Sequence, residues 1–267
     1  MTQDQPDQPP QIDTSMASIA RIYDYWLGGK DNFKADREAA ELMIQQYPDI
    51  VAGVRKNRAF LGRAVHYLAA EAGIRQFLDI GTGIPTANNT HEVAQAVAPD
   101  ARVVYVDDDP IVLSHARALL TSTTAPTSYI DADARDTAKI LAEAAELLDL
   151  SQPTAVMLIA VLHCIPDSDD PYQLVADLMD AVPPGSFLAV THPARDQVDI
   201  ATKAEESLTK SMGQKVTFRT REQVSRFFSG LALADPGVVA IQDWRADSAL
   251  DLNSAPTAMW GGVGRKS

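Results

Sequence analysis

Between residues 75 and 192, five short apolar runs alternate with stretches that have a helical spacing of apolar residues. The runs are RQFLDIG, ARVVYVD, PTSYIDAD, TAVMLIAVL and SFLAVTH, at residues 75–81, 101–107, 126–133, 154–162 and 186–192. Strands that alternate with helices form βα units, and several such units in series build a mainly parallel sheet with helices on both faces. The almost unbroken apolar run TAVMLIAVL is typical of a strand covered on both sides. The alternation therefore predicts an α/β protein with a doubly wound sheet.

Two further strands are expected near the C-terminus, at Val238–Gln242 and Thr257–Val263. About 14 residues without a clear helical pattern join them, so we expect an antiparallel hairpin at one edge of a seven-stranded sheet. The expected helices cover residues 18–26, 36–47, 57–72, 86–98, 137–150, 171–182, 198–211 and 221–228, with one more beginning at Pro110.

The chain divides into three parts. Residues 1–14 are polar and rich in Pro and Gln, which predicts a disordered tail. Residues 15–72 form an N-terminal helical extension, and residues 73–267 form one compact α/β domain. No internal repeat and no long Gly/Ser linker divides that domain.

Polar residues follow each predicted strand, where ligands bind in open α/β sheets. The first strand ends in Asp79-Ile80-Gly81-Thr82-Gly83. Glycines let the chain turn sharply and let a ligand approach the backbone. The dinucleotide fingerprint is incomplete, because Thr86 stands where its third glycine is expected and Pro85 precedes it. A carboxylate at Asp79 would repel a pyrophosphate, so a ligand with an ammonium group is favoured over a dinucleotide.

The second and third strands end in carboxylates. Asp107 lies 26 residues after Gly81, near the position at which an acidic residue accepts both hydroxyls of a ribose. The alternative is an acidic turn or a helix N-cap before Pro110, which suits Asp108 and Asp109 better. Asp133 could meet an exocyclic amine of adenine or could be a plain turn residue.

These motifs together resemble a known class. FLDIGTG, VVYVDDDP, DADARD and the long apolar strand before Leu162-His163 are similar to the motif series of class I S-adenosylmethionine-dependent methyltransferases. RIYDYWLGGKDNFKADREAAE, ADPGVV, DW and MWGGVGRK resemble one group within that class, the actinobacterial S-adenosyl methyltransferase family. The resemblance covers residues from about Ser15 to Lys266 and implies a Rossmann-like fold, S-adenosylmethionine as cofactor and no defined substrate.

The resemblance also implies the placement of the cofactor. Asp79, Gly81, Thr82 and Gly83 would surround its methionine part, with Asp79 near the ammonium group. Asp107 would bind the ribose hydroxyls, and Asp108 or the residue beside it would flank the adenine. The remaining contacts would come from Asp133 and Ala134 at the adenine edge and from Leu162 and His163 below the methionine. Pro85 departs from the wider class, where glycine is common, so the path of this loop is open.

The N-terminal aromatic segment has two interpretations. Tyr23, Tyr25 and Trp26 precede Gly28-Gly29, and a glycine hinge beside aromatic groups suits a lid over a small-molecule site. The alternative is a docking helix that ends at the glycine pair. As a lid, the segment could bring Arg21, Tyr23, Lys30 and Asn32 to the cofactor or substrate. Asn57 and Arg58 are further candidates, with an N-cap as the plain interpretation of Asn57.

Methyl transfer from a sulfonium is an in-line displacement in which the protein mainly supplies orientation. A base is needed only if the acceptor must lose a proton, and His163 is the candidate because imidazole titrates near neutrality. The alternative is a histidine at the edge of the core. His192, next to Pro193, is a weaker candidate for the base.

Charge and cysteine content limit the partners. The net charge of −13 argues against binding nucleic acid or an anionic membrane. The single cysteine Cys164 and the lack of a secretory signal favour a cytoplasmic protein. No metal is expected, because consecutive aspartates do not easily converge on one ion. Three functions stay open: a small-molecule methyltransferase, a cofactor-binding regulatory protein without turnover, and a nicotinamide-dependent oxidoreductase, which the incomplete glycine fingerprint and Asp79 disfavour.

Overall fold

The computed structural model describes residues 13–119, 124–197, 199, 201–246 and 257–267. The predicted disordered tail, residues 1–14, therefore lies outside the described residues except for its last two positions. No helix within the described ranges combines the length and the apolar character that crossing a membrane requires.

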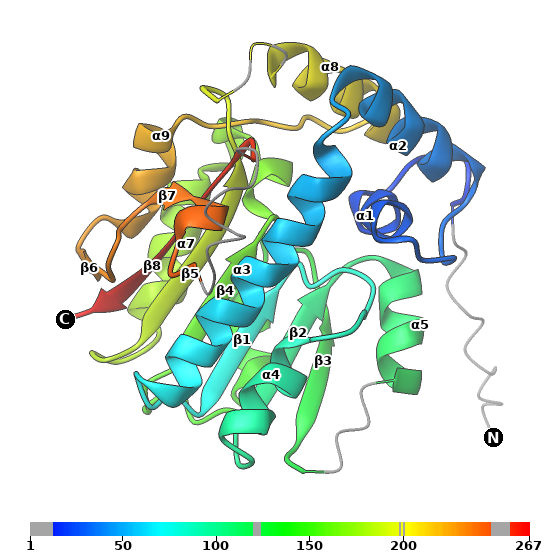
Figure 1. Cartoon of the computed structure of the whole chain (residues 1–267). Helices are drawn as coiled ribbons and strands as arrows, with labels where there is room; N and C mark the ends of the chain where they lie inside the picture. Colours follow the sequence, from blue (N-terminus) through cyan, green and yellow to red (C-terminus); the bar gives the residue numbers. More distant parts are fainter. Residues whose placement is uncertain (1–12, 120–123, 198, 200, 247–256) are drawn as a thin grey trace, which may run out of the picture.

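The described residues form one eight-stranded mixed sheet with five parallel strands (Figure 1). The strand order is β3-β2-β1-β4-β5-β8-β6, and β7 pairs with β8 beside this path. Strands β1 to β5 are parallel neighbours, whereas β8 is antiparallel to β5, β6 and β7. The strands are β1 (Gln76–Ile80), β2 (Arg102–Asp107), β3 (Thr127–Asp131), β4 (Ala155–Ile159), β5 (Phe187–Pro193), β6 (Leu231–Leu233), β7 (Val239–Ala240) and β8 (Met259–Lys266).

Helices connect these strands, and three more precede the sheet. They are α1 (Ile19–Leu27), α2 (Lys34–Gln46), α3 (Ile50–Ala70), α4 (Thr90–Val97), α5 (Pro110–Leu119), α6 (Thr137–Ala144), α7 (Pro171–Asp180), α8 (Ala201–Met212) and α9 (Arg221–Ser225). Short 3₁₀ turns are η1 (Leu162–Cys164), η2 (Asp167–Asp169), η3 (Arg226–Phe228) and η4 (Ile241–Asp243).

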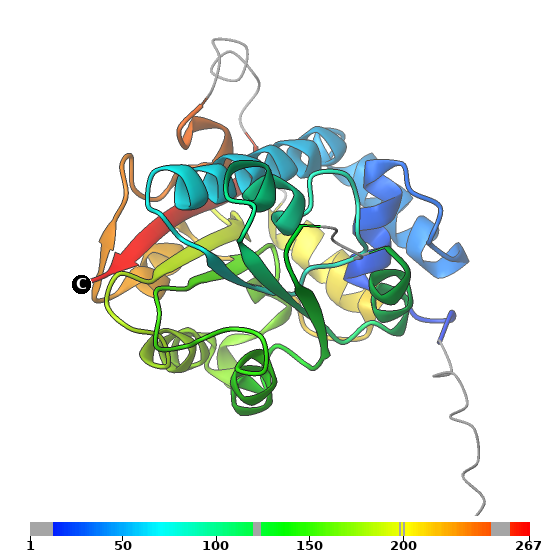
Figure 2. The same ribbon diagram turned by 90° about the horizontal axis from the view of Figure 1, so that it is seen from below.

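Helices cover both faces of the sheet (Figure 2), and each face carries its own core. Because side chains alternate along a strand, Phe77 and Leu78 of β1 point to opposite faces. Phe77 packs in a core with residues of α3 and α4, and Leu78 packs in a core with residues of α6 and α7. The predicted sheet with helices on both faces is confirmed.

A third core joins the N-terminal extension to a late helix. Ile22 and Trp26 of α1 pack with residues of α2 and with Ala204 and Leu208 of α8. In Figure 1, α1, α2 and α8 lie together beyond one end of the sheet. The extension therefore covers the end of the parallel strands.

The predicted count of seven strands is wrong, because the described part of the chain forms eight. The missed strand, β6, is only three residues long and mostly exposed, so it leaves no alternation to detect. The expected antiparallel pairing of the last two strands is confirmed between β7 and β8. However, β8 is not an edge strand, because β5 flanks it on one side and the short strands β6 and β7 flank it on the other.

Several helix boundaries differ from the prediction, among them the end of α6 at Ala144 instead of residue 150 and the starts of α3 and α4. Helix α3 begins at Ile50, seven residues earlier than expected, so Asn57 lies inside the helix and is not its N-cap. Helix α4 begins at Thr90 because Asn89 and Glu92 form a capping box there. Residues 81–89 therefore form a loop after the end of β1.

Candidate functional site

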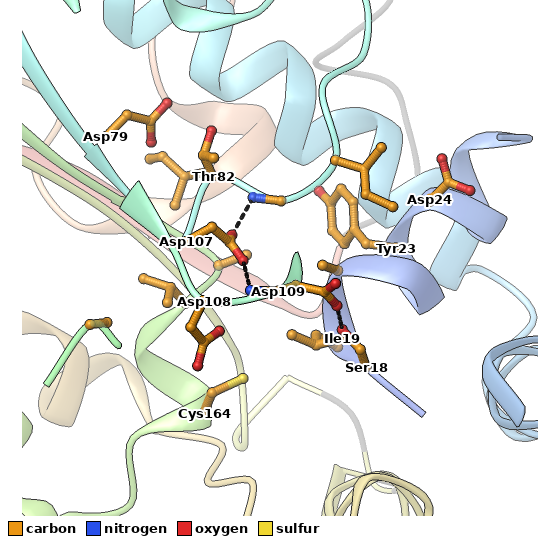
Figure 3. A pocket seen from close by; sticks show the side chains of 18 of the residues that line it. Ser18, Ile19, Tyr23, Asp24, Asp79, Thr82, Asp107, Asp108, Asp109 and Cys164 are labelled. Atoms are coloured by element: carbon orange, nitrogen blue, oxygen red, sulfur yellow. Dashed lines mark hydrogen bonds between the residues drawn. The ribbon is translucent and has the colours of Figure 1, made fainter. Parts of the chain in front are cut away.

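A cavity of about 370 Å³ lies at the carboxyl ends of β1 and β2, under helix α1. The chain runs from β1 outward to β3 and then returns to β4 on the other side of β1, so strand order reverses beside the cavity. Such a switch point is where α/β sheets bind ligands. Figure 3 shows the carboxylates that line this space.

The loop after β1 depends on its two predicted glycines. Gly81 has a φ of +70°, and a Cβ on it would lie 2.3 Å from the side chain of Val161. Gly83 has a φ of +67°, and its N–H donates to Asp107 Oδ2 at 2.8 Å. Both residues and Thr82 line the cavity, so the loop brings backbone close to whatever occupies it.

Asp79 lies at the cavity wall and is 3% exposed. Its Oδ2 accepts a 2.6 Å hydrogen bond from Thr90 Oγ1. Burial raises the pKa of Asp79 to about 6, although the Thr90 bond opposes the shift. A carboxylate held in this way gains from a cation that can pair with it.

Asp107 is the corresponding residue of β2. Its Oδ1 accepts from the backbone N–H of Asp109 at 3.0 Å, and its Oδ2 accepts from Gly83. Burial raises the pKa of Asp107 to about 7, against the effect of these two hydrogen bonds. Each oxygen retains a lone pair, so the side chain can still accept from two ligand hydroxyls.

The other predicted carboxylates have different surroundings. Asp108 lines the cavity, and its pKa is raised by burial and by the nearby Asp133. Asp109 Oδ1 accepts from the N–H of Ile111 in the first turn of α5, as an N-cap residue does. Asp133 lines the cavity next to Ala134, but Arg135 already bonds both of its oxygens.

Of the predicted residues in the N-terminal segment, Tyr23 lines the cavity, whereas Lys30 and Asn32 do not. Lys30 is exposed. Asn32 is buried and donates to Asp24 Oδ2 at 2.8 Å, so it shapes the loop after α1. Asp24 lines the cavity and was missed, because nothing in its sequence surroundings distinguishes it from an ordinary helical aspartate.

Asn57 is 1% exposed and lines the cavity from α3. Its Nδ2 donates to the hydroxyl of Tyr23 at 2.8 Å, while its Oδ1 is buried without a hydrogen-bond partner. An unpaired buried acceptor is costly, and a ligand donor could satisfy it. Arg58 also lines the cavity and donates to the carbonyls of Ala87 and Asn88.

Leu162 and His163 do not line the large cavity. Leu162 is fully buried in the core. His163 is 4% exposed and lines a smaller neighbouring cavity. Burial, assisted by the positive charge of Arg219, lowers the pKa of His163 to about 4, so its imidazole is neutral at pH 7.

Two other residues at the end of β4 were not predicted. Ala160 lines both cavities and has a φ of +54°, a conformation that costs an alanine free energy and that no residue pattern reveals. Cys164 lines the large cavity, and burial raises the pKa of its thiol to about 12. The thiol therefore stays protonated and is a poor nucleophile.

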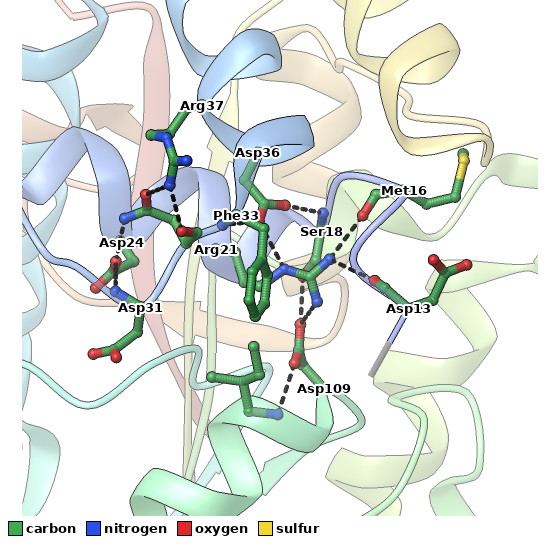
Figure 4. A network of polar contacts seen from close by, with 12 residues as sticks. Asp13, Met16, Ser18, Arg21, Asp24, Asp31, Phe33, Asp36, Arg37 and Asp109 are labelled. Atoms are coloured by element: carbon green, nitrogen blue, oxygen red, sulfur yellow. Dashed lines mark hydrogen bonds and ion pairs between the residues drawn. The ribbon is translucent and has the colours of Figure 1, made fainter. Parts of the chain in front are cut away.

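A buried ion network ties α1 to the end of β2 (Figure 4). Arg21 is 5% exposed; its Nε donates to Asp36 at 2.9 Å and its Nη1 to Asp109 at 3.1 Å. Ser18 Oγ also donates to Asp109 at 2.6 Å. Because the N–H of Asp109 bonds Asp107, this network connects helix α1 directly to the candidate ribose-binding carboxylate.

Comparison with known proteins agrees with this geometry. A family model described as S-adenosyl methyltransferase matches residues 5–267. The chain is similar to a DUF574 family protein from Streptomyces avermitilis MA-4680, with 42% identity, a TM-score of 0.92 and coverage of 96% of this chain and 100% of that one. A Thermobifida fusca YX protein, provisionally assigned as a methyltransferase, is 41% identical with a TM-score of 0.90 and coverage of 97% and 98%.

More distant proteins share the fold. The N-methyltransferase NodS from Bradyrhizobium japonicum WM9 is 13% identical with a TM-score of 0.51, and the match covers 82% of this chain and 98% of that one. No curated protein matches this chain.

Proposed function

The chain belongs to the S-adenosyl methyltransferase family, and from that premise we propose that its methyl acceptor is a small molecule. The protein is an S-adenosylmethionine-dependent methyltransferase with a Rossmann-like fold. A small acceptor is supported by the position of the cavity under α1, where Ile19 and Tyr23 form part of its wall. The net charge of −13 also disfavours a nucleic acid.

The residues of the large cavity fit the cofactor. Two buried carboxylates with raised pKa values, Asp79 and Asp107, line one cavity from adjacent strands, and this observation carries the proposal. The unpaired Oδ1 of Asn57 supplies a further acceptor on the same wall. A ligand with an ammonium group and two vicinal hydroxyls would satisfy all three groups.

We assign the following roles on this basis. Asp79 pairs with the ammonium group, Asp107 accepts from the ribose hydroxyls, and Gly81, Thr82 and Gly83 contact the methionine part. Asp108, Asp133 and Ala134 surround the adenine. Lys30, Asn32 and Leu162, which do not line the cavity, would act only through neighbouring residues.

The bound cofactor supplies the electrophilic methyl group, so this chain's residues orient the acceptor and exclude water. Orientation of two reacting groups can lower a barrier by roughly 7–11 kcal/mol. His163 is neutral and can accept a hydrogen bond from the acceptor. With a pKa of about 4 it is a weak base, so it suits an acceptor that needs little help in losing a proton.

Calorimetry with S-adenosylmethionine and S-adenosylhomocysteine tests the assigned site. Removal of one charge-assisted hydrogen bond costs about 1.5–3 kcal/mol, so Asp107→Ala should weaken binding roughly tenfold or more. Equal affinity in the native protein and this variant would refute the role of Asp107. Release of S-adenosylhomocysteine on a panel of small acceptors then tests turnover, and cofactor binding without release for any acceptor would favour a regulatory binding protein.

A further inference from the structure

A second cavity of about 90 Å³ adjoins the large one. The two cavities share Ile19 and Tyr23 of α1 and the strained Ala160 at the end of β4. The second cavity extends from there toward α2, α3 and α8, the helices that form the third core. A molecule at the shared wall therefore has the cofactor cavity on one side and this smaller space on the other.

The wall of the second cavity is mostly apolar, whereas several carboxylates line the first. Its wall is built largely from apolar side chains such as Trp26, Met43, Leu208 and Phe218, and none of the described residues that line it is Asp, Glu, Lys or Arg. A charged group moved into such surroundings without a partner loses several kcal/mol of hydration or changes its protonation state. The cavity therefore selects against carboxylates, phosphates and ammonium groups.

One polar atom in this wall lacks a partner. His163 lines the cavity, and its Nδ1 is buried without a hydrogen bond. Buried polar atoms are nearly always paired, so this imidazole keeps hydrogen-bonding capacity that a ligand can use. The ring packs edge-on against His192, with 6.2 Å between centroids. A neutral imidazole there can bond one hydroxyl or N–H group.

We propose that the second cavity binds the apolar part of an uncharged methyl acceptor, the edge of a small ring or a short branched chain, and that a ring nitrogen of His163 bonds a hydroxyl or N–H of the same molecule. This inference rests on the proposed methyl transfer to a small molecule. An apolar cavity of about 150 Å³ is large enough for benzene, so 90 Å³ takes roughly the inner part of such a ring. The rest of the acceptor lies at the shared wall beside Tyr23 and Ala160.

The chain offers a matched pair of variants to test this assignment. Gly53 of α3 lines the second cavity, and a Cβ built on it meets no atom within 4 Å. Gly62 lies on the same helix, and its Cβ position is equally free, but it lines neither cavity. Gly53→Leu should fill the cavity, whereas Gly62→Leu should leave it open. Both replace glycine by leucine within one helix, so their effects on helix stability should be similar.

The test uses the full chain loaded with S-adenosylhomocysteine and the neutral probe 4-fluorophenol, followed by fluorine NMR line width. A fragment of this size binds with roughly millimolar affinity. We expect 4-fluorophenol to bind the native protein and the Gly62→Leu variant equally and to bind Gly53→Leu at least tenfold more weakly. The anionic analogue 4-fluorobenzoate should bind at least tenfold more weakly to the native protein. Ala204→Leu, which fills the cavity from α8, replaces Gly53→Leu if that variant does not fold.

Three results would overturn the proposal: no binding of 4-fluorophenol, equal binding to the filled variant, or equal binding of 4-fluorobenzoate. Calorimetry of S-adenosylhomocysteine on the same samples distinguishes failure of the proposed acceptor site from failure of the proposed cofactor site. Cofactor binding should be unchanged in Gly53→Leu, because Gly53 does not line the large cavity. If the native protein binds S-adenosylhomocysteine but not 4-fluorophenol, the acceptor site alone is refuted, and absence of cofactor binding in the native protein refutes the proposed function.

Discussion

The affinity for S-adenosylhomocysteine should depend steeply on pH between 6 and 8, because the two carboxylates assigned to the cofactor titrate there. Burial raises the pKa of Asp107 to about 7 and that of Asp79 to about 6. The ligand needs both in the ionised form, and apparent affinity falls in proportion to the fraction of competent protein. The ionised fraction of Asp107 is about 0.9 at pH 8 and about 0.1 at pH 6, and that of Asp79 falls to about 0.5.

The product of these fractions makes the dissociation constant roughly twentyfold larger at pH 6 than at pH 8. Asp107→Asn removes the larger contribution, so its residual change over the same range should be about twofold. Calorimetry at pH 6, 7 and 8 measures the dissociation constant of S-adenosylhomocysteine in the native protein and in Asp107→Asn. Asp136→Asn is the matched control, since it changes the net charge equally, keeps an N-cap for α6 and does not line the cavity.

The stability of the empty protein should change in the opposite direction. A carboxylate whose pKa is raised on folding holds more protons in the folded than in the unfolded state, so stability decreases as pH rises from about 4 to about 7. The rise in Tm caused by S-adenosylhomocysteine should therefore grow with pH. A flat affinity from pH 6 to 8 in the native protein, or an undiminished slope in Asp107→Asn, would refute the reasoning.

Three further substitutions, two of them paired with a control variant, test the framework of the site by urea unfolding. Arg21→Ala leaves buried carboxylates without their cation and should lower the free energy of unfolding by about 3–5 kcal/mol, whereas Lys34→Ala breaks only an exposed pair and should change it by less than about 1 kcal/mol. Arg219→Leu removes a fully buried donor from two backbone carbonyls and should cost about 2–5 kcal/mol. Ala160→Gly relieves a positive φ and should add about 1 kcal/mol, whereas Ala59→Gly on α3 should cost about 0.5–1 kcal/mol. Equal effects within either matched pair, or a neutral Arg219→Leu, would contradict the argument.

The parallel part of the sheet could be predicted because each strand is a buried apolar run bounded by turn residues. The positions of Asp79 and Asp107 at the cavity could be predicted for the same reason, since a carboxylate at the end of a buried strand faces the switch point. Strand β6 could not be predicted, because three residues, two of them exposed, carry no periodic signal.

The other misses share one physical cause. The contact between Arg21 and Asp109 joins residues 88 positions apart, and single-sequence patterns do not encode such pairings. The strain at Ala160 depends on its neighbours in space, since its N–H donates to the carbonyl of Thr191 on the adjacent strand. Asn32 was assigned to the cofactor from its place beside a glycine pair, but the loop folds it back onto Asp24.

The contacts of α1 bear on whether the N-terminal segment is a lid or a docking element. If α1 moved alone, Ile22 and Trp26 would leave the core shared with α2 and α8, and exposing each would cost roughly 1.5–3 kcal/mol. If α1, α2 and α8 moved together, the contacts among these three helices would stay intact and only their contacts with residues such as Val54 of α3 would be lost. The Arg21–Asp109 pair and the Tyr23–Asn57 hydrogen bond would break, but both would regain water. Any opening over the cofactor cavity should therefore involve the three helices as one unit. The same core would then dock α1 onto α2 and α8 and let the three helices act together as a lid.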